Sequence, residues 1–196
     1  MSVTIAPDDA LIVVDVQHDF LPGGALAVAT GERIFAPIDA LAPRFARVYA
    51  TRDWHPADHS SYAQQGGPWP VHCVAESHGA AFDRRLDLTK VDKIVSKGIV
   101  RETDGYSGFA ATELADDLRE HAVGRVFVCG LATDYCVKHT ALDAAAAGFE
   151  TVVIEDASAP VNVAPDDEAR ALDELRSAGI TIVNSKDITG SARVRQ

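Results

Sequence analysis

Short runs of consecutive apolar residues recur along the chain and limit its possible folds more than any other feature. They lie at 10–14, 48–50, 93–96, 125–129, 151–154 and 181–183, and segments with helical spacing lie between them at 31–45, 108–121, 133–147 and 165–178. Strands without polar alternation suit a parallel sheet covered by helices on both faces. The order of elements predicts a doubly wound α/β fold with a mostly parallel sheet in three layers.

Length and charge narrow the class of protein further. The chain has 196 residues, and this length favours one domain over 1–196. Its formal net charge is −11. Nucleic acid and anionic membranes bind basic surfaces, so we expect neither as a partner. The segment 53–92 is rich in Gly, Pro, His and Trp and lacks periodicity. Such insertions are usually functional or disordered, and we expect this one to supply a metal and substrate site.

The thiols and the N-terminal segment predict a location. Three cysteines, Cys73, Cys129 and Cys136, are too few for a disulfide framework in a chain this long. The first residues lack the basic region and apolar core of a signal peptide, and no apolar run approaches the roughly 20 residues that span a bilayer. We therefore expect a soluble cytoplasmic protein with reduced thiols.

Chemically active side chains follow the predicted strands where each strand ends. Asp15 follows the first, Asp53 and His55 the second, Lys97 the third and Cys136 the fourth. Ligands bind outside the carboxyl ends of the strands in open α/β sheets. We therefore expect these groups to converge at one edge of the sheet.

Cys136 is the sharpest candidate for a nucleophile. With Thr133 as N-cap, it would lie in the first turn of a helix, where free N–H groups favour a thiolate and can stabilise an oxyanion. A buried structural thiol is the commoner fate of a free cysteine. Asp15 and Lys97 could be a base with its orienting cation, or a cap or structural ion pair.

The insertion contains the side chains of a possible metal site. Asp53, His55, His59 and His72 are ligand types that suit Zn²⁺, Fe²⁺ or Mn²⁺. Histidines exposed to solvent in a loop are the alternative. The aromatic residues near these groups could wall a pocket for a flat ligand, or could simply cover the core; they are Phe20, Trp69 and Tyr106.

Six segments between about residues 9 and 183 together resemble the isochorismatase-like cysteine hydrolase superfamily, which includes nicotinamidases/pyrazinamidases, isochorismatases and N-carbamoylsarcosine amidases. The Asp-Trp-His and Trp-Pro-x-His-Cys motifs are similar to the nicotinamidase branch. The segments are Val14-Asp15-Val16-Gln17-His18-Asp19-Phe20, Thr51-Arg52-Asp53-Trp54-His55-Pro56, Trp69-Pro70-Val71-His72-Cys73, Ser96-Lys97-Gly98, Tyr106-Ser107-Gly108-Phe109 and Gly130-Leu131-Ala132-Thr133-Asp134-Tyr135-Cys136-Val137.

The resemblance implies a role for each matching residue. The implied triad is Asp15, Lys97 and Cys136. One divalent ion would be bound by Asp53, His55 and His72, and His59 stands where some members supply a further ligand, although its spacing from His55 is shorter. The oxyanion would meet the N–H groups of Ala132 and Cys136, beside a cis bond between Leu131 and Ala132. The implied ring pocket consists of Phe20, Trp69, Tyr106 and Tyr135.

The implied activity is metal-dependent hydrolysis of nicotinamide to nicotinate and ammonia, with pyrazinamide as a further substrate, no organic cofactor and a possible homo-oligomer. One alternative is a related cysteine amidase for carbamoyl or ureido substrates, which would not need the metal. Another is a non-catalytic binding protein, for which the triad would have no use. A thiol-redox role is weaker, because Cys129 is expected inside a strand and no CxxC pair exists.

Overall fold

A parallel sheet forms the centre of the computed structural model, which describes residues 2–192. Its strand order is β4-β3-β2-β5-β6-β7, and all neighbouring strands are parallel. The strands are β2 (Asp9–Val14), β3 (Arg47–Asp53), β4 (Lys93–Lys97), β5 (Arg125–Leu131), β6 (Glu150–Ala159) and β7 (Thr181–Val183). The predicted fold class is confirmed. The chain builds outward from β2 in both directions, so the order reverses between β2 and β5, where such sheets bind ligands.

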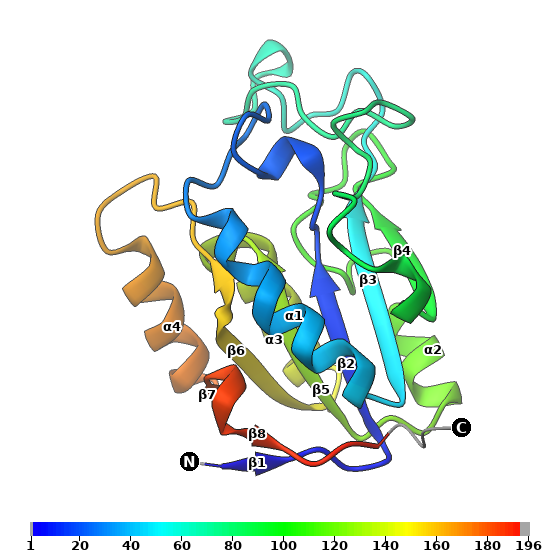
Figure 1. Cartoon of the computed structure of the whole chain (residues 1–196). Helices are drawn as coiled ribbons and strands as arrows, with labels where there is room; N and C mark the ends of the chain where they lie inside the picture. Colours follow the sequence, from blue (N-terminus) through cyan, green and yellow to red (C-terminus); the bar gives the residue numbers. More distant parts are fainter. Residues whose placement is uncertain (1, 193–196) are drawn as a thin grey trace.

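Helices cover both faces of this sheet (Figure 1). Leu11 and Val13 of β2 belong to the apolar cluster that includes α1, whereas Ile12 and Val14 belong to the cluster that includes α2, α3 and α4. Neighbouring strand residues point to opposite faces, so a wholly apolar strand requires both layers. The helices are α1 (Phe35–Leu41), α2 (Leu114–Glu120), α3 (Lys138–Ala146) and α4 (Asp167–Ser177).

The helices are shorter than the sequence predicts. The segment 31–45 divides into α1 and two flanking 3-10 turns, Gly31–Ile34 and Ala42–Arg44. The prediction of helix over 108–113 is wrong. Ala111 has a φ of +54°, outside the helical region, and the Thr112 hydroxyl donates to the Gly108 carbonyl in a turn. A small second sheet of β1 (Val3–Thr4) and β8 (Ile188–Thr189) was not predicted.

Loops from the insertion gather above the carboxyl ends of β2, β3 and β4 (Figure 1). Between 54 and 92 the regular elements are only the 3-10 turns Ala63–Gln65 and Leu88–Lys90. Isolated bridges join His55 to Val74 and Tyr62 to Trp69. The insertion is therefore an ordered cover for the edge of the sheet where the chain reverses.

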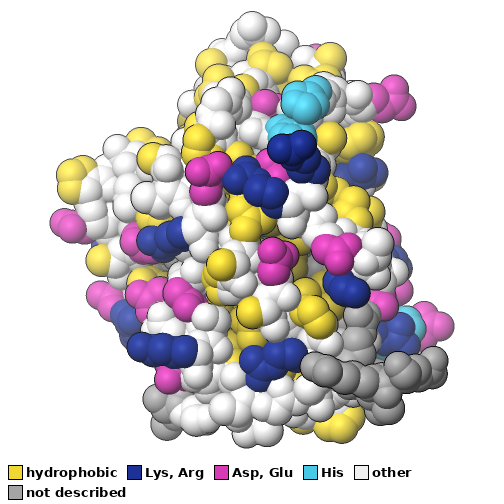
Figure 2. Space-filling model, in the orientation of Figure 1, with side chains coloured by type: hydrophobic (Ala, Val, Ile, Leu, Met, Phe, Trp, Pro, Cys, Tyr) yellow, Lys and Arg dark blue, Asp and Glu magenta, His cyan; other side chains and the backbone are white. Residues whose placement is uncertain are grey.

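Acidic and basic side chains are interspersed over the face that carries α1 (Figure 2). Although the net charge of the chain is −11, this face therefore carries charges of both signs. Within residues 2–192, we find no helix that is long and apolar enough to cross a lipid bilayer.

Candidate active site

A cavity of about 200 Å³ opens at the point where the strand order reverses. Its walls come from the end of β3, the insertion, the segment after β4 and the turn after β5. Nine of the predicted site residues from these segments line it together: Asp53, His55, His59, Trp69, His72, Tyr106, Ala132, Tyr135 and Cys136. The convergence expected at one edge of the sheet is confirmed here for Asp53, His55 and Cys136.

The residues predicted as a triad lie next to this cavity. The Lys97 ammonium is 2.7 Å from Asp15 Oδ2 and 3.5 Å from Cys136 Sγ. Asp15 and Lys97 are almost completely buried, so their opposite charges compensate each other away from water. The Thr51 hydroxyl donates to Asp15 Oδ1 at 2.7 Å and fixes the carboxylate from the other side. The arrangement places a carboxylate, a cation and a thiol within one buried group.

The charge balance of this group keeps the thiol protonated at rest. Burial raises the pKa of Asp15 to about 6, against the opposing attraction of Lys97. Burial also raises the pKa of the Cys136 thiol well above its usual value; Lys97 lowers it and Asp15 raises it again. A resting thiolate is therefore not favoured, because burial outweighs the nearby cation. Near neutral pH, ionised Asp15 lies beside a neutral thiol.

Lys97 also joins the triad to the candidate metal site. Its ammonium lies 2.5 Å from Asp53 Oδ1. Burial would raise the pKa of the Asp53 carboxyl. Lys97 and then His55 together outweigh burial and hold this pKa below its usual range. Ligand-type atoms of Asp15, Asp53 and Cys136 lie within 4.8 Å of one another. The Lys97 ammonium already supplies the cation that these atoms surround.

The candidate metal site is a second buried group, beside that of Asp15, Asp53 and Cys136. Its ligand-type atoms lie within 4.8 Å of one another and belong to Asp53, His55 and His72. The His55 Nδ1 lies 2.8 Å from the Gly98 carbonyl, and the His72 Nδ1 lies 2.7 Å from the Pro70 carbonyl. A carbonyl can only accept, so each Nδ1 carries a hydrogen and Nε2 is the nitrogen available to a metal.

The free Nε2 atoms of both histidines turn toward the same carboxylate oxygen. They lie 3.3 Å (His55) and 4.0 Å (His72) from Asp53 Oδ2. Burial lowers the pKa of His72, which favours the neutral form that binds metals. Ligating histidines commonly donate their other N–H to a backbone carbonyl. These residues therefore fit a divalent ion.

Glycine is required where β4 ends beside His55. Gly98 has a φ of +61°, and a Cβ there would lie 2.3 Å from His55 Cε1. Any side chain at this position would displace the imidazole that the Gly98 carbonyl orients. The glycine thus belongs to the support of the candidate metal site.

The aromatic residues expected around a ring pocket do line the cavity. Trp69 Nε1 donates to the Tyr106 hydroxyl at 2.8 Å, and the Trp69 and Tyr135 rings meet edge to face at 5.0 Å. Phe20 also lines the cavity and lies 5.7 Å from the His72 ring. Four aromatic side chains beside the polar groups of the candidate metal site suit a flat heteroaromatic ligand.

The turn that carries Cys136 differs from the expected helix start. Ala132 is the N-cap residue, and the Thr133 side chain makes no capping hydrogen bond. The segment Thr133–Val137 forms one π turn before α3. The expected cis bond between Leu131 and Ala132 is confirmed. Ala132 and Cys136 both line the cavity, as an oxyanion site would require.

The two other thiols lie outside the reactive group. Cys129 is buried inside β5, and Cys73 is buried in the apolar cluster that includes α1. Burial raises the pKa of both thiols, which makes them poor nucleophiles. The prediction that Cys129 serves packing agrees with this position.

Sequence reasoning missed three residues that hold the site in place. The Gln17 amide accepts from the Asp53 N–H and donates to the Asp53 carbonyl, both at 2.8 Å. Thr51 binds Asp15, as described above. Asp134 accepts from the N–H groups of Val161 and Asn162 at 2.9 and 2.8 Å. The available signal was their position, because all three are polar residues within two positions of a predicted site residue.

The fold and the site define an α/β protein with a buried cysteine, aspartate and lysine beside a candidate metal site. A family model described as the isochorismatase domain matches residues 9–187. The chain belongs to this family.

Several relatives share the family and most of the chain length. A nicotinamidase from Escherichia coli is 39% identical, over 92% of this chain and 97% of that protein. The structure of PnC1 from L. infantum in complex with nicotinate aligns with a TM-score of 0.92 and 38% identity, covering 96% and 99% of the two chains. The pyrazinamidase of Pyrococcus horikoshii in complex with zinc aligns at 0.84 and 47% identity, covering 91% and 99%.

Proposed function

We propose that this protein hydrolyses nicotinamide to nicotinate and ammonia, and accepts pyrazinamide as a related substrate. The observation that carries the proposal is the buried Asp15–Lys97–Cys136 group opening onto an aromatic cavity. Binding alone gives no reason to bury a thiol beside a carboxylate of raised pKa. Similarity to the nicotinamidase from Escherichia coli supports the choice of substrate.

Attack by the thiol is the first chemical step. Asp15 takes the Cys136 proton as Sγ bonds to the carboxamide carbon, while Lys97 holds Asp15 ionised and oriented. The N–H groups of Ala132 and Cys136 would stabilise the oxyanion of the tetrahedral intermediate. Protonated Asp15 then gives its proton to the leaving nitrogen, and ammonia departs as the thioester forms.

Water completes the cycle. Asp15, ionised again, takes a proton from a water molecule that attacks the thioester carbonyl. The carbon–sulfur bond breaks, Cys136 recovers its proton from Asp15, and the acid formed gives its carboxyl proton to solvent and leaves as nicotinate. One residue thus serves as base and acid in alternation, which suits a carboxyl with a pKa of about 6.

The aromatic and metal-binding residues would place the substrate. Trp69, Tyr106 and Tyr135 enclose the ring from the sides. A divalent ion (Zn²⁺, Fe²⁺ or Mn²⁺) held by Asp53, His55 and His72 would supply Lewis-acid binding of the pyridine nitrogen, directly or through water. Chelation is therefore expected to raise KM or abolish activity. The thiol also requires a reducing compartment, which is why we place the reaction in the cytoplasm.

Ammonia release by purified protein tests the proposal. Nicotinamide, pyrazinamide and N-carbamoylsarcosine are offered separately, with and without added Zn²⁺. We expect release from the two ring amides, and a loss of about 10⁴-fold or more in Cys136→Ala with an unchanged circular dichroism spectrum. Release from the carbamoyl compound alone, or full activity in Cys136→Ala, would contradict the proposal.

A further inference from the structure

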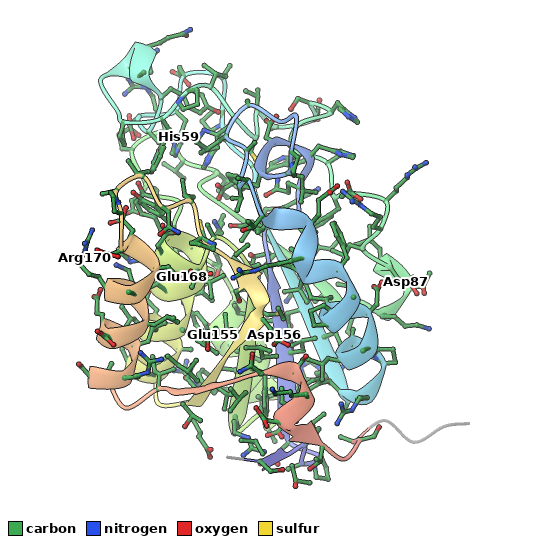
Figure 3. All side chains as sticks on the ribbon, turned by 60° about the vertical axis from the view of Figure 1, so that its left-hand side comes forward. His59, Asp87, Glu155, Asp156, Glu168 and Arg170 are labelled. Atoms are coloured by element: carbon green, nitrogen blue, oxygen red, sulfur yellow. The ribbon has the colours of Figure 1, made fainter. Side chains whose placement is uncertain are left out.

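Three buried histidines surround the candidate metal site, and one of them is oriented differently. His55 and His72 direct Nδ1 to backbone carbonyls and Nε2 to Asp53. His59 is equally buried, and its ring stacks on the His55 ring with centroids 4.0 Å apart. Figure 3 places His59 among the loops above the carboxyl ends of the strands.

Both nitrogens of His59 already have partners within the chain. Nε2 lies 2.9 Å from the Thr103 carbonyl, which can only accept, so Nε2 carries the hydrogen. Nδ1 lies 3.3 Å from the Ser61 N–H, which can only donate, so Nδ1 is the acceptor. The Ser61 hydroxyl adds a second contact to Nδ1 at 2.7 Å. This neutral tautomer has no lone pair left for a metal.

The Thr103 carbonyl belongs to the segment 98–106, which lies over the site. This segment contributes Gly105 and Tyr106 to the cavity wall. It is bonded to the insertion by His55 at Gly98, by the Ser60 N–H at the Arg101 carbonyl, by His59 at Thr103 and by Trp69 at Tyr106, and Arg101 forms an ion pair with Asp58. At its far end, the Gly105 carbonyl accepts from Lys97. The His59 contact thus holds the middle of the segment, between the bonds at Arg101 and at Tyr106.

We propose that His59 is a positioning residue that seats the segment 98–106 over the cavity, and that it is not a ligand of the metal. The inference rests on the proposed function for the identity of the substrate. It explains why a third histidine is buried here in the opposite tautomer from its two neighbours. It also predicts that metal binding and substrate binding respond differently when His59 is replaced.

Two variants of His59 separate the roles. His59→Gln can still donate to the Thr103 carbonyl, whereas His59→Phe keeps the ring stacked on His55 but loses both hydrogen bonds. His72→Gln is the control for loss of a ligand. Zn²⁺ affinity is measured by competition with a chromogenic chelator. We expect about wild-type affinity in both His59 variants and a loss of about 10- to 100-fold or more in His72→Gln.

Substrate binding and amide exchange provide the second readout. In His59→Phe we expect the nicotinamide KM to rise about fivefold, which is the effect of one net hydrogen bond, with kcat nearly unchanged. His59→Gln should restore KM to within about twofold. Hydrogen exchange of the Ser60 amide, which is bonded to Arg101, should accelerate in His59→Phe only.

Each outcome decides the proposal. A loss of Zn²⁺ affinity in His59→Gln as large as in His72→Gln would make His59 a ligand and overturn it. An unchanged KM and unchanged Ser60 exchange in His59→Phe would reduce His59 to a packing residue and also overturn it. If wild-type protein fails to hydrolyse nicotinamide, the proposed function fails, but the affinity and exchange measurements still test the role of His59.

Discussion

Replacing Lys97 by Met removes the only cation that contacts the carboxylates of both Asp15 and Asp53 among residues 2–192. The ammonium is completely buried, so its loss would leave Asp15 without water or a counter-ion and Asp53 with only His55 and His72 beside it. Breaking a buried ion pair typically costs about 3–5 kcal/mol. In a chain of this size each kcal/mol lowers Tm by about 2–4 °C. We therefore expect the apo protein to lose about 6–20 °C.

The loss should also depend on pH in a defined direction. Without Lys97, burial raises the folded-state pKa of Asp15 further above its unfolded value, because the lowering influence of the ammonium is gone. The folded state then favours the protonated carboxyl, so the variant loses stability as pH rises above about 4. The difference in Tm from wild type should be smaller at pH 5 than at pH 8.

Thermal unfolding followed by circular dichroism, in the presence of a chelator, measures both effects. Lys186→Met is the matched control, because Lys186 is exposed and its loss should change Tm by less than about 2 °C. The double variant Lys97→Met/Asp15→Asn should recover part of the loss, since one uncompensated charge is removed. A Tm within about 2 °C of wild type for Lys97→Met, or a deficit independent of pH, would refute the ionic description of the site.

Three further predictions follow from single contacts. Asp15 must be ionised to act as base, so with a pKa of about 6 we expect kcat/KM to be about tenfold lower at pH 5 than at pH 7; a flat profile would exclude that role. Gly98→Ala would force a Cβ to within 2.3 Å of His55, so Zn²⁺ affinity measured by calorimetry should fall at least tenfold, and an unchanged affinity would contradict the ligand assignment. Asp134→Ala removes the hydrogen bond from the Val161 N–H to the turn Thr133–Val137, which carries Cys136, and kcat/KM should fall about tenfold. Equal activity would show that this contact is dispensable.

The central sheet was predictable because its signal is local and strong. Continuous runs such as 10–14 can be buried only between two layers, and the structure places them so. The segment 108–113 was wrongly predicted as helix because its apolar spacing suits one. In the structure the Gly108 N–H donates to the Thr140 hydroxyl, a partner distant in sequence that the spacing does not reveal. Two-residue strands such as β1 carry too little pattern to detect.

The site was predictable in its members but not in its connections. Strand ends brought Asp15, Asp53 and Lys97 to one edge, as the fold requires. That Lys97 contacts both carboxylates depends on the pairing of β3 with β4, where Asp53 stands opposite Lys97. The resting protonation of Cys136 depends on burial, which the sequence does not specify. These features arise from three-dimensional packing.

The central claim is that Cys136 carries the acyl group during amide hydrolysis. Mixing the protein with nicotinamide, quenching in acid within the first turnovers and mapping peptides by mass spectrometry tests it directly. We predict a nicotinoyl group on the Cys136 thiol, located by fragmentation because Cys129 lies on the same tryptic peptide, and absent from Cys73, from Cys129 and from the Cys136→Ala variant. Steady ammonia release by Cys136→Ala, at the wild-type rate and with no acylated cysteine, would contradict it.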